Sequence, residues 1–232
     1  MLKIENTEVM GFEAAIRGMR NPMNSWEKSD SHKDGCRCTP LCYKSKDYTV
    51  GPEDLDLMTR LCNAGTDHRK YMRMITVYLD ITAPLYWWKE FDTYKVGTVA
   101  NSCSTMHKIT AKEFTLEDFS CEHLMDLSLD TLRSIVKILN CYRNGYLALR
   151  SKPTKDTEKR KRDLKRLWWQ MIQLLPSSYN QRRTVMLNYE VLANIYKSRR
   201  NHKLDEWHTF CDWIESLPYS DLITGEEKHG AV

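Results

Sequence analysis

The sequence predicts an α+β fold: a single domain with a central, mostly antiparallel sheet flanked by helices, and a helix-rich C-terminal half. Residues 74–82 are rich in β-branched and aromatic side chains, which is typical of a strand. Residues 127–149 repeat leucine and isoleucine at spacings of three and four, which is typical of a helix. No internal repeat divides the 232 residues, so one domain is the economical interpretation.

The first half contains alternating strand and helix signals. The N-terminal residues favour a strand, and residues 12–20 favour a short amphipathic helix. Pro52 opens a further helix that Gly65 ends, because proline suits a first helical turn and glycine suits the residue after the last. Pro84 ends the strand at 74–82 and begins a helix that runs to about Lys95. Its two adjacent tryptophans predict that this helix is internal.

The second half is predicted to be mainly helical. Helices are expected at 162–175, 189–197 and 204–217. We expect the domain to span residues 1–223, with a Cys-bearing loop at 32–52, a charged linker at 152–163 and a mobile tail at 224–232.

Composition excludes several classes of protein. The chain has 35 Lys and Arg against 31 Asp and Glu, a net charge of +4, which disfavours a dedicated nucleic-acid binder. Charged residues interrupt the apolar stretches, so no run approaches the ~20 residues that cross a bilayer. The N-terminus lacks the basic start and apolar core of a signal peptide. We therefore expect a cytoplasmic protein without a membrane partner.

The eight cysteines are expected to be reduced thiols, because a chain of this length without an export signal rarely carries a disulfide framework. Five of them are scattered through patterned segments and are expected to be small buried hydrophobes. These five are Cys62, Cys103, Cys121, Cys141 and Cys211.

The other three cysteines cluster after a histidine. Cys36, Cys38 and Cys42, with His32, have the residue types of a tetrahedral zinc site. The spacing C-x-C-x3-C is not a common zinc-module spacing, so a polar loop without a metal is the favoured interpretation.

Several common motifs are absent from the sequence. There is no G-x-G-x-x-G or G-x4-G-K phosphate loop, no G-x-S-x-G elbow, no H-E-x-x-H and no C-x-x-C. What remains is a polar strip at 98–108 and three basic clusters, at 68–70, 180–183 and 199–203. An anionic ligand held by arginine side chains would explain these clusters.

Two regions resemble the flavin-dependent thymidylate synthases (ThyX). Residues 65–108 follow the family's signature region: a helix ending in glycine, a histidine at His68, a strand, Ala83-Pro84, a helix, and Thr93-Tyr94-Lys95 in place of the family's Arg-His-Arg. The second region matches the family's Leu-Pro, strand and N-x3-L-x-N-x4-R helix, with a tryptophan soon after. Its matching residues are Leu175-Pro176, the strand at 184–187, Asn188, Leu192, Asn194, Arg199 and Trp207.

The resemblance implies a ThyX-like fold that binds a dUMP-like nucleotide, with FAD as a cofactor. It implies cofactor-binding roles for His68, Tyr94, Asn188 and Asn194, and substrate-binding roles for Glu90, Lys95, Ser102, Ser104 and Arg199. Arg199 is also the implied catalytic residue, with Arg200 as the alternative because one residue is inserted before Trp207. NADPH and methylenetetrahydrofolate are implied only if synthase activity is retained. The family's active sites form between the subunits of a tetramer, which implies a homo-oligomer.

The chain departs from the family where charge matters. FAD and a nucleotide monophosphate bring about four negative charges, and Thr93-Tyr94-Lys95 supplies one ammonium that cannot form a bidentate fork. Four interpretations therefore stay open: modification of a pyrimidine nucleotide, including its methylation; nucleotide binding or sequestration without catalysis; an interaction module for nucleic acid or protein that uses residues 152–166; and a fold whose basic clusters are only solvated surface.

Overall fold

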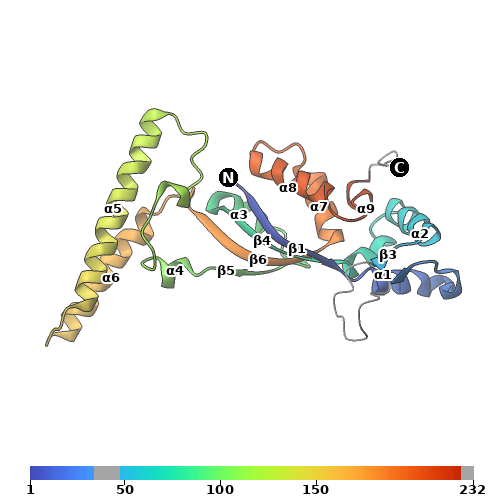
Figure 1. Ribbon diagram of the computed structural model, residues 1–232, viewed down its shortest axis with the longest axis horizontal. Helices are drawn as coiled ribbons and strands as arrows, with labels where there is room; N and C mark the ends of the chain where they lie inside the picture. Colours follow the sequence, from blue (N-terminus) through green and yellow to red (C-terminus); the bar gives the residue numbers. More distant parts are fainter. Residues whose placement is uncertain (34–47, 226–232) are drawn as a thin grey trace, which may run out of the picture. The chain divides into compact units, whose positions relative to one another are not determined.

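Figure 1 shows the computed structural model, which describes residues 1–33 and 48–225. Its main sheet is antiparallel, with four strands in the order β1-β4-β6-β5. The strands of this sheet are β1 (Lys3–Met10), β4 (Thr76–Pro84), β6 (Asn180–Asn188) and β5 (Val99–Ser102). A second, two-stranded sheet pairs β2 (His32–Lys33) with β3 (Tyr48–Thr49). The predicted α+β class is confirmed.

Helices account for most of the described residues outside the two sheets. The α-helices are α1 (Phe12–Arg20), α2 (Pro52–Asn63), α3 (Leu85–Phe91), α4 (Thr105–Lys108), α5 (Asp126–Ser151), α6 (Thr157–Leu174), α7 (Tyr189–Arg199), α8 (Asp205–Glu215) and α9 (Asp221–Thr224). The 3-10 helices are η1 (Asn21–Met23), η2 (Trp26–Lys28), η3 (Arg69–Met74) and η4 (Leu116–Asp118).

Strand β4 shows why the sequence folds as a sheet. Val77, Leu79 and Ile81 are at most 1% exposed, whereas the residues between them are half-buried or exposed. This alternation places every second side chain on one buried face, as the pleat of a strand requires. Helix α3 follows directly, and its Trp87 and Trp88 are buried as predicted.

The chain divides into two compact units. The first comprises residues 1–3, 81–93 and 101–184. In it, α5 and α6 pack side by side as a long antiparallel hairpin (Figure 1). Its core cluster consists of Ile109, Phe114, Phe119, Leu132, Leu139 and Met171.

The second unit comprises the described residues among 4–80, 94–100 and 185–232, and contains α1, α2, α7, α8 and α9. Gly11 allows α1 to pack closely, because its φ is +101° and a Cβ there would lie 2.1 Å from the Met74 carbonyl oxygen. Large side chains fill this unit's interior. They include Ile16, Met58, Met72, Ile75, Trp207 and Phe210.

Several element boundaries differ from those predicted, and β6 starts at Asn180 rather than at 184. Helix α6 begins at Thr157 rather than at 162, because the Asp156 side chain caps it by accepting a hydrogen bond from the Lys159 amide at 2.8 Å. Helix α3 ends at Phe91 rather than near Lys95. Thr224, expected to start a mobile tail, is the last residue of α9, and residues 226–232 lie outside the described part.

The prediction that the scattered cysteines are buried is only partly correct. Cys211 is buried, but Cys103 and Cys141 are exposed. Cys103 follows the edge strand β5, whose residues are all exposed, and Cys141 lies on α5, most of which faces away from the core. Cys36, Cys38 and Cys42 lie outside the described residues, whereas His32 belongs to β2.

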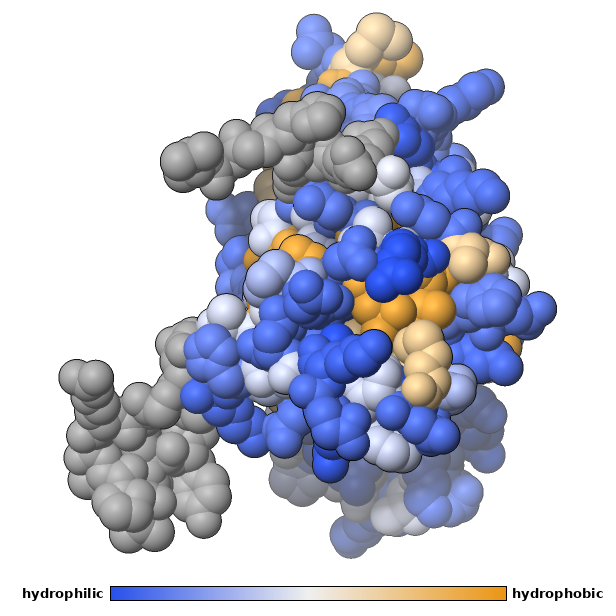
Figure 2. All heavy atoms as spheres, turned by 90° about the vertical axis from the view of Figure 1, so that its right-hand side faces the viewer, coloured by the Kyte–Doolittle hydropathy of each residue, from blue (hydrophilic) through white to orange (hydrophobic). Residues whose placement is uncertain are grey.

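The visible surface over α1 and α2 is mostly hydrophilic (Figure 2). Within residues 1–33 and 48–225, every helix is too short or too polar to cross a lipid bilayer.

A buried ion pair joins α1 to α2. The Nε of Arg20 donates to Oδ1 of Asp54 at 2.5 Å, and the two side chains are 5% and 0% exposed. The other carboxylate oxygen accepts hydrogen bonds from the Ser29 and Ser31 hydroxyls at 2.7 and 2.6 Å. Burial alone would raise the pKa of Asp54, but the hydrogen bonds from Ser31, Ser29 and Arg20 outweigh it, so the pKa is lowered.

Replacing Asp54 by Asn should lower the free energy of unfolding by about 3 kcal/mol, because it leaves the buried Arg20 without its counter-charge. A lowered pKa contributes stability that is present above the unfolded value of about 3.9 and is lost as the pH falls below it. Wild-type protein should therefore lose more stability than D54N between pH 5 and pH 3, as measured by urea unfolding.

Asp56 provides the matched control on the same helix, because its ion pair with Arg60 is exposed. D56N should change the free energy of unfolding by less than about 0.5 kcal/mol. Equal effects of D54N and D56N would contradict a structural role for the buried pair.

Candidate functional site

Helix α7 organises the candidate site, and Asn188 fixes where it begins. Asn188 ends β6, and its side-chain Oδ1 accepts a hydrogen bond from the Val191 amide at 3.0 Å. Asparagine is among the preferred residues at this position because it satisfies an amide of the first turn. Asn188 is 8% exposed, so the cap is buried. It sets the register of α7 and hence the positions of Asn194 and Arg199.

The segment 94–97 lies against α7. Gly97 has a φ of +81°, and a Cβ on it would lie 2.9 Å from Asn188 Nδ2 and 3.1 Å from Val191 Cγ2. Glycine is therefore required both by the backbone conformation and by the contact. The buried Thr98 Oγ1 has no hydrogen-bond partner among the described residues.

Arg199 is held at the other end of α7 by two aromatic rings. Its Nε donates to the Tyr94 hydroxyl at 2.9 Å, and its guanidinium carbon lies 4.9 Å from the centroid of the Trp207 ring. The Trp207 side chain is fully buried, so it is a fixed surface for the guanidinium. Tyr94 and Trp207 themselves meet edge to face at 6.2 Å. Arg199 is thus preorganised rather than freely rotating.

Arg69 attaches η3 to the middle of the same helix. Its Nη2 donates to Asn194 Oδ1 at 3.3 Å, and its Nε lies 2.9 Å from Oε2 of Glu190, a carboxylate that is almost fully buried. The Nε and Oε2 atoms are close enough for an ion pair, although their angle is not that of a hydrogen bond. His68 directly precedes Arg69 and is exposed.

Arg69 and Glu190 were not predicted as site residues. The only sequence signal for Arg69 is its place in the basic cluster 68–70, and Glu190 has no signal of its own. Their pairing joins residues far apart in the chain and becomes visible only in the folded protein.

The structure gathers some of the predicted residues around α7, and others belong to the first unit. Tyr94, Asn188, Asn194 and Arg199 lie on or against α7, and the exposed Lys95 follows Tyr94 directly. His68 belongs to the same unit as α7, and three further predicted residues belong to the first unit. Of these, Glu90 is half-buried in α3, Ser102 ends β5, and Ser104 caps α4 by accepting from the His107 amide at 3.3 Å.

The basic cluster at 180–183 also contains an anchored arginine. In the first unit, Arg183 pairs with Asp92 at 2.7 Å, and its guanidinium carbon lies 4.1 Å from the centroid of a Trp88 ring. Its Nε donates to the Gln181 side chain at 3.0 Å. Through these contacts Arg183 holds β6 against α3.

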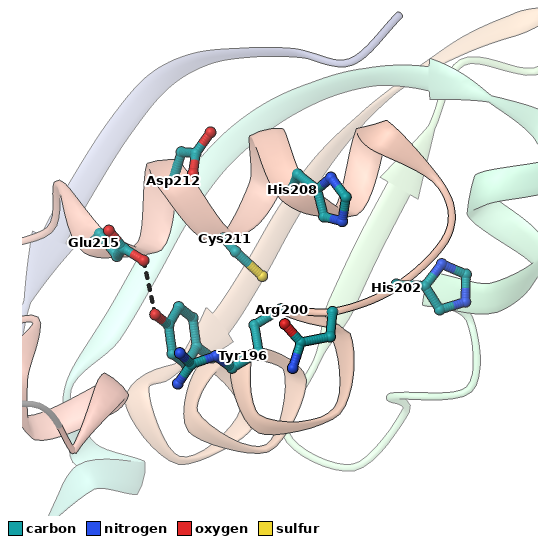
Figure 3. A pocket seen from close by; sticks show the side chains of 8 residues that line it. Tyr196, Arg200, His202, His208, Cys211, Asp212 and Glu215 are labelled. Carbon is teal, nitrogen blue, oxygen red and sulfur yellow. Dashed lines mark hydrogen bonds between the residues drawn. The ribbon is translucent and has the colours of Figure 1, made fainter.

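The neighbouring Arg200 faces a different surface from Arg199. Its guanidinium carbon lies 5.4 Å from the centroid of the Tyr196 ring, beside a pocket of about 560 Å³ between α7 and α8 (Figure 3). The Tyr196 hydroxyl donates to Glu215 at 2.7 Å, and burial raises the pKa of Cys211 to about 11, so this thiol stays protonated at neutral pH. The lining residues are Tyr196, Arg200, Asn201, His202, His208, Cys211, Asp212 and Glu215.

Metal coordination finds no support in the part of the chain that the structure describes. Among those residues, no three His, Cys, Asp or Glu side chains are grouped so as to hold a metal ion.

Comparison with solved structures identifies the fold class. The chain has the fold of the flavin-dependent thymidylate synthases. The crystal structure of flavin-dependent thymidylate synthase ThyX from Helicobacter pylori complexed with FAD and dUMP matches with a TM-score of 0.64 and 14% identity, covering 96% of this chain and 98% of that chain. A second crystal structure of Helicobacter pylori ThyX with FAD and dUMP matches with a TM-score of 0.64 and 16% identity, covering 98% and 100%. No family model matches the sequence, and neither does any curated protein.

Replacing Gly97 by Ala should lower the free energy of unfolding by more than a left-handed backbone alone explains. Gly65 provides the control, because it has a φ of +106° and a Cβ there would meet no atom within 4 Å. We expect G65A to cost about 1 kcal/mol and G97A about 1 to 3 kcal/mol more, since its Cβ displaces the Asn188 cap. Urea unfolding measures both; equal losses would show that the Asn188 contact is not needed.

Proposed function

We propose that the chain binds a pyrimidine nucleotide of the dUMP type, together with FAD, at the surface organised by α7. The observation that carries this proposal is that Asn194 and Arg199 lie on α7 and Asn188 caps it, at the places to which the resemblance assigns flavin and nucleotide. The two matching structures of the same fold contain FAD and dUMP, which supports the proposal.

Arg199 is the proposed nucleotide-binding residue. Stacking on Trp207 and the hydrogen bond to Tyr94 fix its guanidinium before a ligand arrives, which lowers the entropic cost of binding. The adjacent Lys95 is exposed and adds an ammonium that suits a phosphate. This arrangement retains a cationic site although the family's Arg-His-Arg is absent.

The amide groups on α7 fit a flavin. Asn188 and Asn194 each use the side-chain oxygen in a hydrogen bond within the chain, whereas neither amide nitrogen donates one to a described residue. Each nitrogen is thus a donor that suits the oxygens and ring nitrogens of a flavin. We assign these two residues, with His68 and Tyr94, to FAD. A bound flavin would supply hydride transfer.

Two activities of such a site are distinguished by turnover. Methylation of the pyrimidine needs NADPH and methylenetetrahydrofolate besides FAD. Nucleotide binding without turnover is the second candidate. This second candidate is favoured by Tyr94, which replaces the histidine of the family's Arg-His-Arg and whose hydroxyl accepts a hydrogen bond from Arg199. Production of dTMP from dUMP with both co-reactants decides between them.

Flavin binding is tested by the absorbance spectrum of the purified protein and by titration with FAD. We expect flavin bands to be retained with the protein through gel filtration. Protein that is colourless and takes up no FAD would overturn the flavin part of the proposal, while dUMP binding measured by calorimetry tests the nucleotide part separately.

Replacing Arg199 by Lys should weaken dUMP binding about tenfold or more, because the ammonium cannot keep both the Trp207 stacking and the planar donors. R200K is the matched control, because it makes the same substitution at the next residue, and Arg200 faces the pocket beside Tyr196. We expect R200K to bind dUMP within twofold of wild type in calorimetry. The reverse order would assign the nucleotide to Arg200.

We also propose a homotetramer, by analogy with the family. Light scattering coupled to gel filtration should give about 110 kDa, four times the chain mass of 27.4 kDa. A monomer of unchanged nucleotide affinity would contradict a site formed between subunits.

A further inference from the structure

The net charge of +4 is unevenly distributed along the chain. Residues 126–174, which form the α5–α6 hairpin, carry 12 Lys and Arg against 5 Asp and Glu, a net charge of +7. The rest of the chain therefore has a net charge of −3. The hairpin is a strongly basic element in an otherwise slightly acidic protein.

Most of this charge is unpaired and lies at one end of the hairpin. Between residues 150 and 166 only two of the cations make ion pairs with described residues, Lys161 with Glu158 and Arg166 with Asp163, and both pairs are exposed. The other cations in this stretch make no ion pair within the described chain. They are Arg150, Lys152, Lys155, Lys159, Arg160, Arg162 and Lys165.

Four of the cations are exposed along α6 and just before it. Lys159, Arg162 and Arg166 follow one another at spacings of three and four, which places them along one face of α6, and Lys155 directly precedes the Asp156 cap. Trp169 continues the row three residues later and is 41% exposed. From Lys159 to Trp169 the row spans about 15 Å at 1.5 Å per residue. We call these five residues the α6 row.

Trp169 is held in place although it is exposed. Its ring meets that of Trp168 at 4.8 Å and 69°, and the Trp168 indole donates to the Met106 carbonyl oxygen at 2.9 Å. An exposed, oriented indole beside a row of cations has the features of a surface that stacks a base while cations contact the phosphates.

We propose that the α6 row binds single-stranded nucleic acid, with the four cations on the phosphate backbone and Trp169 stacked on a base. This surface lies on the hairpin and is independent of the nucleotide site proposed on α7. An acidic membrane is disfavoured by its surroundings. Among residues 150–174, Trp169 is the one large apolar side chain that is exposed, which is too little for the apolar face of a helix that lies on a membrane, and Met125 and Leu127 lie at the far end of α5.

The test is fluorescence anisotropy of a labelled 15-nucleotide thymidine strand with the full-length protein at 50 to 200 mM salt. Four phosphate contacts predict a slope of log K against log salt of about −3, so binding should weaken about 50-fold over this range. No binding at 50 mM salt, or tighter binding of the matching duplex or of anionic vesicles, would overturn the proposal.

The triple variant K159Q/R162Q/R166Q should bind the strand at least tenfold more weakly and make the salt slope shallower by about 2. K28Q/R73Q/K89Q removes three exposed cations outside the hairpin and is the control for net charge; it should bind within twofold of wild type. Equal losses in the two triple variants would show that binding follows net charge alone, and would overturn the assignment to the α6 row.

Trp169 gives a second, uncharged readout. W169A should lower affinity about fivefold or more without changing the salt slope, and W169F should restore most of the binding because it keeps an aromatic face. Unchanged affinity of W169A would overturn base stacking. Circular dichroism and dUMP binding, which all these variants should retain, show that the fold and the α7 site are intact.

Discussion

The side-chain cap of Asn188, at the junction of β6 and α7, is the interaction on which the candidate site depends. A strand and a helix meet there without an intervening loop, so one side chain must both end the strand and satisfy the first helical turn. The close approach of Gly97 buries this cap and places the segment 94–97 along α7. Tyr94 can then reach Arg199 about three turns further along the helix. A local requirement of the backbone thus determines the position of the cation proposed to bind nucleotide.

Each of the three basic clusters contains an arginine that makes contacts within the protein. Arg69 and Arg183 each pair with a carboxylate from a distant part of the sequence, and Arg199 contacts the distant Tyr94, so each attaches one element to another. Neighbouring cations such as Lys70 and Lys203 are exposed. A cluster that looks uniform in sequence therefore contains one structural arginine and neighbours that face solvent. An anchored guanidinium can still bind a ligand, because stacking on a ring fixes its plane while leaving the edge of that plane as the donor surface.

The sequence predicted the elements whose periodicity is strong. The alternation in β4 and the leucine spacing of α5 both follow from burial on one face, and the spacing of apolar residues in the sequence shows such burial directly. The start of α6 was misplaced because Asp156 lies in a charge run that resembles a linker, and its role as a cap depends on one hydrogen bond. The residues on α7 were found through family resemblance. The pairing of Arg69 with Glu190 and that of Tyr94 with Arg199 join segments about 100 or more residues apart, and no local pattern encodes such contacts.

Net charge was a weak guide to partners because electrostatic attraction at a surface is local. At physiological salt, charges separated by more than about 8 Å are largely screened from one another, so a ligand responds to the nearby groups and not to the total of +4. On α6 the cations at spacings of three and four have Cβ atoms about 5–6 Å apart, so their fields add at the surface where we propose that nucleic acid binds. Outside the hairpin the chain is slightly acidic, so a nucleotide on α7 gains little from the general field. It must be held by particular groups, and the fixed geometry of Arg199 between Tyr94 and Trp207 matters more there than the number of cations.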